Sequence, residues 1–221
     1  MYTVNLIVTF ISTILVLFTA FFVLYKNRTI KSQAWNFYFI YNFVAAGIPG
    51  CIFLTYFMYD SPNLAIYSKF SQTFGIIFFA SILNLALTYP GKDKKVPLYI
   101  PILIILPAVI FSIVIFSTDL TIKSAKFENW QLVREKGVLY PLYSAISFLY
   151  FIISWIIFLI NYIKTKVEAY RLQIRYVFLA TSLFLTLGYI GSIFLPLVAN
   201  DYTFYALGIS SACIVSTITL F

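Results

Sequence analysis

The stretch VNLIVTFISTILVLFTAFFVLY, from Val4 to Tyr25, contains no charged residue and is followed at once by Lys26-Asn27-Arg28. A helix needs about 20 mostly apolar residues to cross the hydrocarbon core of a bilayer, and this stretch is long enough. Because no basic residue precedes it, it lacks the pattern of a cleavable signal peptide. The stretch therefore predicts a first membrane-spanning helix that stays in the protein and places its own N-terminus outside the cell.

Six further apolar segments follow the first one. The seven predicted spans cover residues 4–25, 35–59, 67–89, 98–117, 139–162, 176–198 and 203–221. Of all residues in the chain, 62% are hydrophobic and 10% are charged, whereas about 25% are charged in an ordinary soluble domain. A soluble domain with this composition would expose large apolar patches to water. The sequence therefore predicts an all-α membrane protein, a seven-transmembrane helix bundle that forms a single domain over residues 1–221.

The connections between the spans differ in charge. The connections at residues 26–34, 90–97 and 163–175 carry ten basic residues and two acids, whereas the other side of the bundle carries five of each. Cytoplasmic loops are enriched in Lys and Arg. This pattern predicts a multi-pass protein of the bacterial plasma (inner) membrane, with the N-terminus outside and the C-terminus in the cytoplasm. The net charge of +8 belongs to these membrane flanks, so we expect no nucleic-acid partner.

Residues 118–138 form the longest connection, and it lies on the predicted outer side. Two runs of alternating polar and apolar residues, 121–127 and 130–134, flank the polar pair Glu128-Asn129. This alternation predicts a small extracellular β-hairpin between the fourth and fifth helices. On the same side, Lys69 lies near the start of the third span, where its long side chain can reach the membrane interface.

Several kinds of chemistry are missing from the sequence. It contains no histidine, no acidic residue in the middle of a span, and no GxSxG, P-loop or HExxH pattern. Histidine is the commonest metal ligand and a frequent general base, and intramembrane carboxylates usually build proton relays. We therefore expect no catalytic residue, no metal site and no cofactor in this segment.

Neutral polar residues within the spans allow two interpretations. Most of them stabilise a bundle through hydrogen bonds between helices. Those in the outer halves of the helices are candidates for a ligand pocket that opens to the outside, since such pockets are mostly apolar with a few orienting polar groups. The candidate pocket residues are Tyr56, Gln72, Tyr143 and Ser147, with Trp130 of the hairpin as a roof.

Two basic residues at the start of the sixth span form a second candidate site. Arg171 and Arg175 are four positions apart, so they share one face of a helix. Guanidinium groups at this level of the membrane are placed to meet the phosphates of lipid headgroups. The sequence therefore predicts a membrane-interface contact here, and the lipid bilayer itself as a partner.

Five short segments, taken together in order, resemble a known family. They are LALTYP at 85–90, GVLYPLY at 137–143, QIRYVF at 173–178, LP at 195–196 and YALG at 205–208. Over essentially the whole chain they resemble the N-terminal seven-transmembrane region of bacterial sensor histidine kinases, which is also found fused to PAS or diguanylate cyclase modules. The resemblance implies a sensor that acts as a homodimer in the full-length protein, with a cytoplasmic output module after the seventh helix. A histidine-bearing dimerisation helix and an ATP-binding module are absent from these residues, so we expect the chain to be the input part of a longer protein.

The leading hypothesis is a transmembrane signal-sensing input domain. It would relay an extracellular or membrane stimulus, such as an unidentified small molecule, to a cytoplasmic output module. A small seven-helix solute transporter is the alternative, although such carriers show internal repeats and no convincing repeat is visible here. A membrane anchor without a ligand is the third hypothesis.

Overall fold

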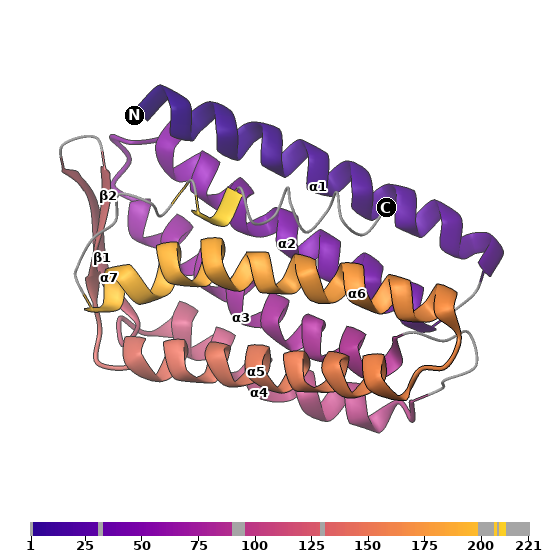
Figure 1. Ribbon diagram of the computed structural model, residues 1–221. Helices are drawn as coiled ribbons and strands as arrows, with labels where there is room; N and C mark the ends of the chain where they lie inside the picture. Colours follow the sequence, from indigo (N-terminus) through magenta and orange to yellow (C-terminus); the bar gives the residue numbers. More distant parts are fainter. Residues whose placement is uncertain are drawn as a thin grey trace.

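The computed structural model describes residues 2–30, 33–89, 96–128, 131–198, 206 and 208–210. Over these residues, long helices run side by side, and a two-stranded sheet lies at one end of them (Figure 1). The helices are α1 (Tyr2–Ile30), α2 (Gln33–Phe57), α3 (Leu64–Thr88), α4 (Tyr99–Ser117), α5 (Tyr140–Lys164), α6 (Glu168–Leu183), the π-helix η1 (Phe184–Phe194) and the short α7 (Leu195–Val198). Ala206 and Gly208–Ser210, within the predicted seventh span, are also helical.

Within the described residues, six helical segments are long and apolar enough to cross a membrane. They are Tyr2–Lys26, Gln33–Phe57, Leu64–Thr88, Tyr99–Ser117, Tyr140–Lys164 and Glu168–Val198. Large apolar side chains such as Phe18, Leu103 and Ile113 are at least 60% exposed on the outside of the bundle. This exposure is unfavourable in water but suits contact with lipid tails. The predicted all-α membrane bundle is therefore confirmed.

Helix α3 is the central helix of the described bundle. It packs against α2, α4, α5 and the first strand of the hairpin. In its most apolar window 72% of the residues are buried, whereas the corresponding value for α4 is 22%. Small buried residues such as Ala80, Ser81 and Ala86 let the neighbouring backbones come close, as is usual between helices in a membrane. A polar side chain on α3 therefore points into protein rather than into lipid.

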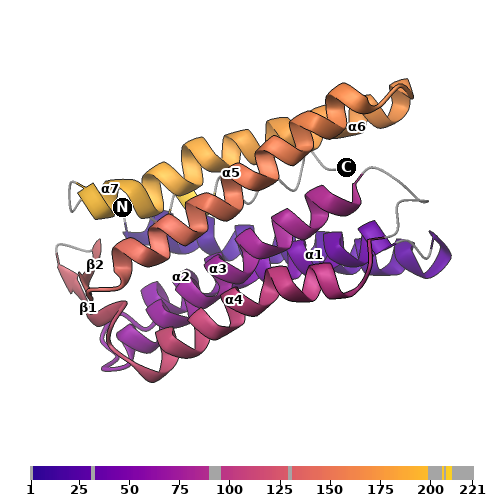
Figure 2. The same cartoon turned by 90° about the horizontal axis from the view of Figure 1, so that it is seen from below.

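The hairpin closes one end of the bundle. Strand β1 (Ile122–Glu128) pairs antiparallel with β2 (Gln131–Lys136), so the predicted hairpin between the fourth and fifth helices is confirmed. Its inner face carries Leu132, which is 1% exposed, and Phe127, whose ring packs edge-on against Tyr56 at a centroid distance of 5.2 Å. Figure 2 shows the hairpin at the same end as the N-terminus.

The last described span changes from α-helix to π-helix at η1. The hydroxyls of Thr181, Ser182 and Thr186 donate to backbone carbonyls four residues earlier, at 2.9, 2.7 and 2.7 Å. Such bonds compete with the regular backbone ladder, and Gly188 and Gly191 further weaken an α-helix because they have no side chain. These residues explain why the regular helix ends here. π-Helical turns are rare and concentrate at functional sites.

Several helix ends differ from the predicted spans. Helix α1 continues to Ile30 rather than ending at Tyr25, and α6 begins at Glu168 rather than Tyr176. The reason is that apolarity marks only the part of a helix that lies in lipid, while charged residues extend the same helix beyond it. The predicted connection 163–175 therefore shrinks to residues 165–167. Most of the predicted span 203–221 lies outside the described residues.

Gly47 marks a very close contact between α2 and α3. A Cβ atom at Gly47 would lie 2.5 Å from the ring of Phe74. We expect Gly47→Ala to lower the free energy of unfolding by about 1–3 kcal/mol, because the ring and the helix must shift to relieve the overlap. The measurement is reversible unfolding of the purified protein in detergent. Gly50→Ala is the control, since its Cβ would approach only Thr13, at 3.4 Å. Equal losses in both variants would contradict a specific contact at Gly47.

Candidate functional site

A small cavity lies beneath the hairpin, between α2, α3, α5 and η1. Its volume is about 30 Å³, which is enough for one or two water molecules. Ile48, Phe79 and Ile193 are among its apolar lining residues. The polar groups of the lining come from Ser71, Gln72, Arg134, Tyr140, Tyr143, Tyr189 and Ser192. The cavity thus has the mixed character of a ligand site, apolar walls with a few polar groups.

Gln72 of α3 is the most conspicuous polar residue of the cavity. It is 3% exposed, and neither its Nε2 nor its Oε1 atom has a hydrogen-bond partner among the described residues. A buried amide without partners costs roughly 1–3 kcal/mol. The same amide offers two donor hydrogens and an acceptor oxygen to whatever enters the cavity. Gln72 therefore brings unused hydrogen-bonding capacity to the cavity, and its role in ligand binding stays a prediction.

Arg134 of β2 brings a positive charge to the cavity. Strand alternation turns Leu132 and Arg134 inward and leaves Glu135 outside, so Arg134 is only 4% exposed. Among the described residues that line the cavity, none is acidic. A guanidinium stays charged at any physiological pH and offers five donors in a planar fork. Arg134 therefore adds guanidinium hydrogen-bond donors to the polar part of the cavity lining.

Arg134 also lines a recess of about 440 Å³ on the hairpin itself. The other lining residues include Lys126, Glu128 and Lys136. Lys126 Nζ lies 2.6 Å from Glu128 Oε1, and this hydrogen bond raises the pKa of Lys126, whereas burial lowers the pKa of Lys136. Lys136 donates a hydrogen bond to the carbonyl oxygen of Pro196, which ties the hairpin to α7. The recess and the inner cavity thus share one residue, Arg134.

Two tyrosines join the cavity to the surrounding helices. The Tyr143 hydroxyl of α5 comes so close to α3 that a Cβ atom at Gly75 would lie 2.6 Å from it. In η1, the Tyr189 hydroxyl lies 3.0 Å from Ser144 Oγ and donates to the Ser144 carbonyl oxygen at 3.3 Å. These contacts link η1 and α3 to the start of α5.

The sequence-predicted pocket residues are distributed over more than one place. Gln72 and Tyr143 line the same cavity. Tyr56 lies elsewhere, where Asn5 Nδ2 donates to its hydroxyl at 3.0 Å, and Ser147 is fully buried outside the cavity lining. Trp130 lies outside the described residues. Their common role as ligand contacts stays a prediction.

Of the described lining residues, only Gln72 and Tyr143 were predicted, and Arg134 and Tyr189 are two of those that were not. The alternation of the hairpin strands was visible in the sequence and does place Arg134 on the same face as Leu132. It does not show which face of the hairpin meets the bundle. Tyr189 reaches the cavity from a π-helix, for which the apolar pattern of the span gives no signal.

The predicted interface arginines lie in α6, at the end of the bundle away from the hairpin (Figure 1). Both Arg171 and Arg175 are exposed. The guanidinium of Arg171 stacks over the ring of Tyr162, 4.7 Å from its centroid, and so connects α6 to the end of α5. Their contact with lipid phosphates stays a prediction.

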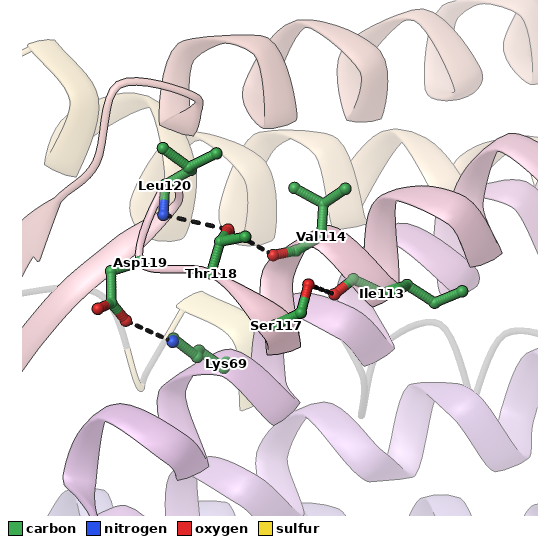
Figure 3. Close-up of polar contacts among 7 residues, drawn as sticks. All are labelled: Lys69, Ile113, Val114, Ser117, Thr118, Asp119 and Leu120. Atoms are coloured by element: carbon green, nitrogen blue, oxygen red, sulfur yellow. Dashed lines mark hydrogen bonds and ion pairs between the residues drawn. The ribbon is translucent and has the colours of Figure 1, made fainter.

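Lys69, whose side chain was predicted to reach the membrane interface, forms an ion pair at the hairpin end of the bundle. Its Nζ atom lies 2.7 Å from Asp119 Oδ1, and its side chain is 11% exposed (Figure 3). Asp119 follows the last turn of α4, where the Thr118 hydroxyl donates to the Val114 carbonyl at 2.7 Å. The ion pair therefore holds α3 against the link between α4 and the hairpin.

Comparison with known families assigns the chain to one of them. Residues 8–221 match the family described as the N-terminal 7TM region of histidine kinase. No curated protein sequence matches the chain significantly. The match spans nearly the entire chain, including the hairpin and every element that lines the cavity.

Because the buried amide of Gln72 has no hydrogen-bond partner, its contribution to stability can be tested by replacing it. We expect Gln72→Leu to raise the free energy of unfolding by about 1 kcal/mol, because it replaces a buried amide without partners by an apolar group of similar size. The measurement is unfolding of the purified protein in detergent.

Asn161→Leu is the matched control. Asn161 Nδ2 donates to the carbonyl oxygens of Ala86 and Tyr89, both at 2.9 Å, so this variant is expected to lose about 1 kcal/mol. A comparable loss in Gln72→Leu would show that its amide stabilises the bundle like any other.

Proposed function

The chain belongs to the family of N-terminal seven-transmembrane regions of histidine kinases, and we propose that it is the input domain that senses an extracellular or membrane stimulus and relays it to a cytoplasmic output module. The observation that carries this proposal is the cavity beneath the hairpin. It combines the unsatisfied amide of Gln72 with the buried guanidinium of Arg134. The chain is a multi-pass membrane protein, and the proposal assigns it signal reception rather than catalysis.

The charge distribution supports an orientation with the hairpin outside the cell. The end away from the hairpin carries the basic residues Lys26, Arg28, Lys164, Lys166, Arg171 and Arg175. The hairpin end carries acids such as Asp60, Asp119 and Glu135 beside its basic residues. Since basic loops remain in the cytoplasm, we place the basic end inside and the cavity near the outer surface of a bacterial plasma membrane.

The walls of the cavity suggest how a signal would travel. Gly188, Tyr189 and Ser192 of η1 line it, and so does Ile209, which lies in the described part of the last predicted span. These two segments pack so closely that a Cβ atom at Gly208 would lie 2.5 Å from the Leu187 carbonyl oxygen. A ligand in the cavity would touch both.

A stimulus changes the output only if it binds two packing states with different affinity. We propose that η1 is the element with two arrangements, because its π-helical backbone departs from the regular helix on either side. The last span then carries the change to the cytoplasmic module, with the full-length protein acting as a homodimer.

The hydrogen bonds between Tyr189 and Ser144 provide the test of this function. In the full-length protein, we expect Tyr189→Phe to change basal autophosphorylation in membrane vesicles by up to about eightfold, because two hydrogen bonds are lost. Hydrogen bonds between membrane helices contribute about 0.6 kcal/mol each, and these join η1 to α5. Tyr150→Phe is the control, since it removes a 2.7 Å bond from α5 to the Ile104 carbonyl of α4, remote from η1. Unchanged output in Tyr189→Phe, or equal changes in both variants, would count against signalling through η1.

The orientation can be tested separately with two matched lysine replacements. Lys123 and Lys166 are both exposed, one on the hairpin and one between α5 and α6. We expect a membrane-impermeant maleimide to label Lys123→Cys, but not Lys166→Cys, on intact cells, because the basic end faces the cytoplasm. The parent chain, with its native cysteines, gives the background. The reverse labelling pattern would invert the proposed topology.

A further inference from the structure

We propose that the junction of α5 and α6 binds one anionic phospholipid, whose headgroup phosphate lies between Arg171 and Arg175. Its acyl chains lie along Trp155 and Phe178, deeper in the membrane. We call five residues of these two helices the α5–α6 seam: Trp155, Tyr162, Arg171, Arg175 and Phe178. The seam begins at the end of the bundle away from the hairpin (Figure 1). Lipid binding here is a second function beside signal reception and does not depend on it.

One stripe of α6 faces the end of α5. The Arg171 guanidinium stacks over the Tyr162 ring, 4.7 Å from its centroid. Two turns further along α6, the Phe178 ring stacks on the Trp155 indole with 4.7 Å between the centroids. Arg175 occupies the position of the same stripe between them, four residues after Arg171 and three before Phe178. Both arginines therefore belong to the side of α6 that borders α5.

The charge of the ligand follows from the basic surroundings of the seam. Residues 164–175 contain four basic residues and one acid, Glu168, and the other predicted cytoplasmic connections, 26–34 and 90–97, together contain six basic residues and one acid. Two guanidinium groups on one helix face can hold the oxygens of one phosphate, since each presents a planar fork of donors. A zwitterionic headgroup carries the same phosphate but adds an ammonium group, which this basic end repels. The seam therefore favours an anionic phospholipid.

The acyl chains of the ligand follow from the depth of the aromatic residues. Phe178 lies seven residues after Arg171, which is about 10 Å along the helix axis. The headgroup layer is about 5–8 Å thick on each side of the bilayer. When the arginines lie at the level of the phosphates, Phe178 and its partner Trp155 therefore lie at the level of the chains. Beside them in the sequence, Leu179 and Ile156 are 45% and 47% exposed and extend the apolar surface. A soluble phosphate has no group for this part of the seam, so the ligand is a lipid.

Tyr162 prepares Arg171 for binding. A long side chain loses rotamer freedom when a ligand fixes it, and this loss weakens binding. The contact with the Tyr162 ring restricts the Arg171 guanidinium before a lipid arrives. Tyr162 is itself half-buried near the end of α5, so its ring is held by the bundle. Tyr162 is therefore a positioning residue of the lipid site.

Two lipids with the same chains test the proposal. Native mass spectrometry of the complete chain in detergent measures the binding of dioleoyl phosphatidylglycerol and dioleoyl phosphatidylcholine, each added in a titration. We expect phosphatidylglycerol to bind about fivefold more tightly, the effect of one basic residue beside an anionic headgroup. Inorganic phosphate and glycerol phosphate, which lack acyl chains, are expected not to displace the bound lipid even in large excess.

Variants of the chain locate the site. Arg171→Gln and Arg175→Gln are each expected to weaken phosphatidylglycerol binding about fivefold, and the double variant is expected to bind the two lipids equally. Arg28→Gln is the matched control, because it removes an exposed arginine from the same basic end but from α1, and it is expected to bind like the parent. Tyr162→Leu is expected to weaken phosphatidylglycerol binding about threefold, whereas Tyr162→Phe, which keeps the ring, is expected to bind normally.

Three results would overturn the lipid site. Equal losses in Arg28→Gln and in the two seam variants would indicate a general attraction between the basic end and anionic lipids. Displacement of the lipid by inorganic phosphate would make the ligand a soluble anion, and equal binding of the two lipids by the parent chain would remove the selection by charge. Each of these results leaves the sensory function in place, because that function is tested by the kinase output of Tyr189→Phe.

Discussion

The hydrocarbon core of a bilayer offers no hydrogen-bond partner, so each span satisfies its backbone internally as a helix and turns its apolar side chains outward. Polar side chains are then sorted to the inside of the bundle, where they need partners. Many find a carbonyl oxygen, as Asn161 does at the end of α3 and Tyr150 does on α4. Gln72 finds none among the described residues, although it lies on the most buried helix. The same constraint that builds the bundle therefore makes the Gln72 amide stand out, because both of its polar atoms lack a partner there.

The hairpin is part of the site as well as a cover for the bundle. Its inner face places Leu132 against the helices and Arg134 in the cavity lining, while its charged outer side keeps Glu135 in solvent. It is fixed to the bundle at two places, through the packing of Phe127 on Tyr56 and through Lys136 at the Pro196 carbonyl. The second contact joins it to the end of the same span that contains η1. The hairpin, the cavity and η1 therefore form one connected region.

In the proposed function, the π-helix η1 is the element of this region that switches. In η1, side-chain hydroxyls and two glycines weaken the α-helical ladder, while Tyr189 and the close approach of Gly208 fix its position relative to α5 and the last span. In the proposed function, signal reception at the cavity and transmission along the last span therefore depend on the same few contacts.

The sequence by itself determined the six spans that the structure describes, the hairpin, and the absence of histidine and of acids from the span centres, and it singled out Gln72 and Tyr143, which line one cavity. These follow from hydropathy, strand alternation and composition, which are local properties of the chain. Only the tertiary structure decided that Arg134 lines the cavity, that Lys69 pairs with Asp119, and that Tyr56 and Ser147 do not line the cavity with Gln72. These facts depend on which elements pack together: Lys69 and Asp119 are 50 positions apart, and the inward face of the hairpin is set by the helices beneath it. Local patterns show which residues are unusual, but contacts between distant segments decide which of them form one site.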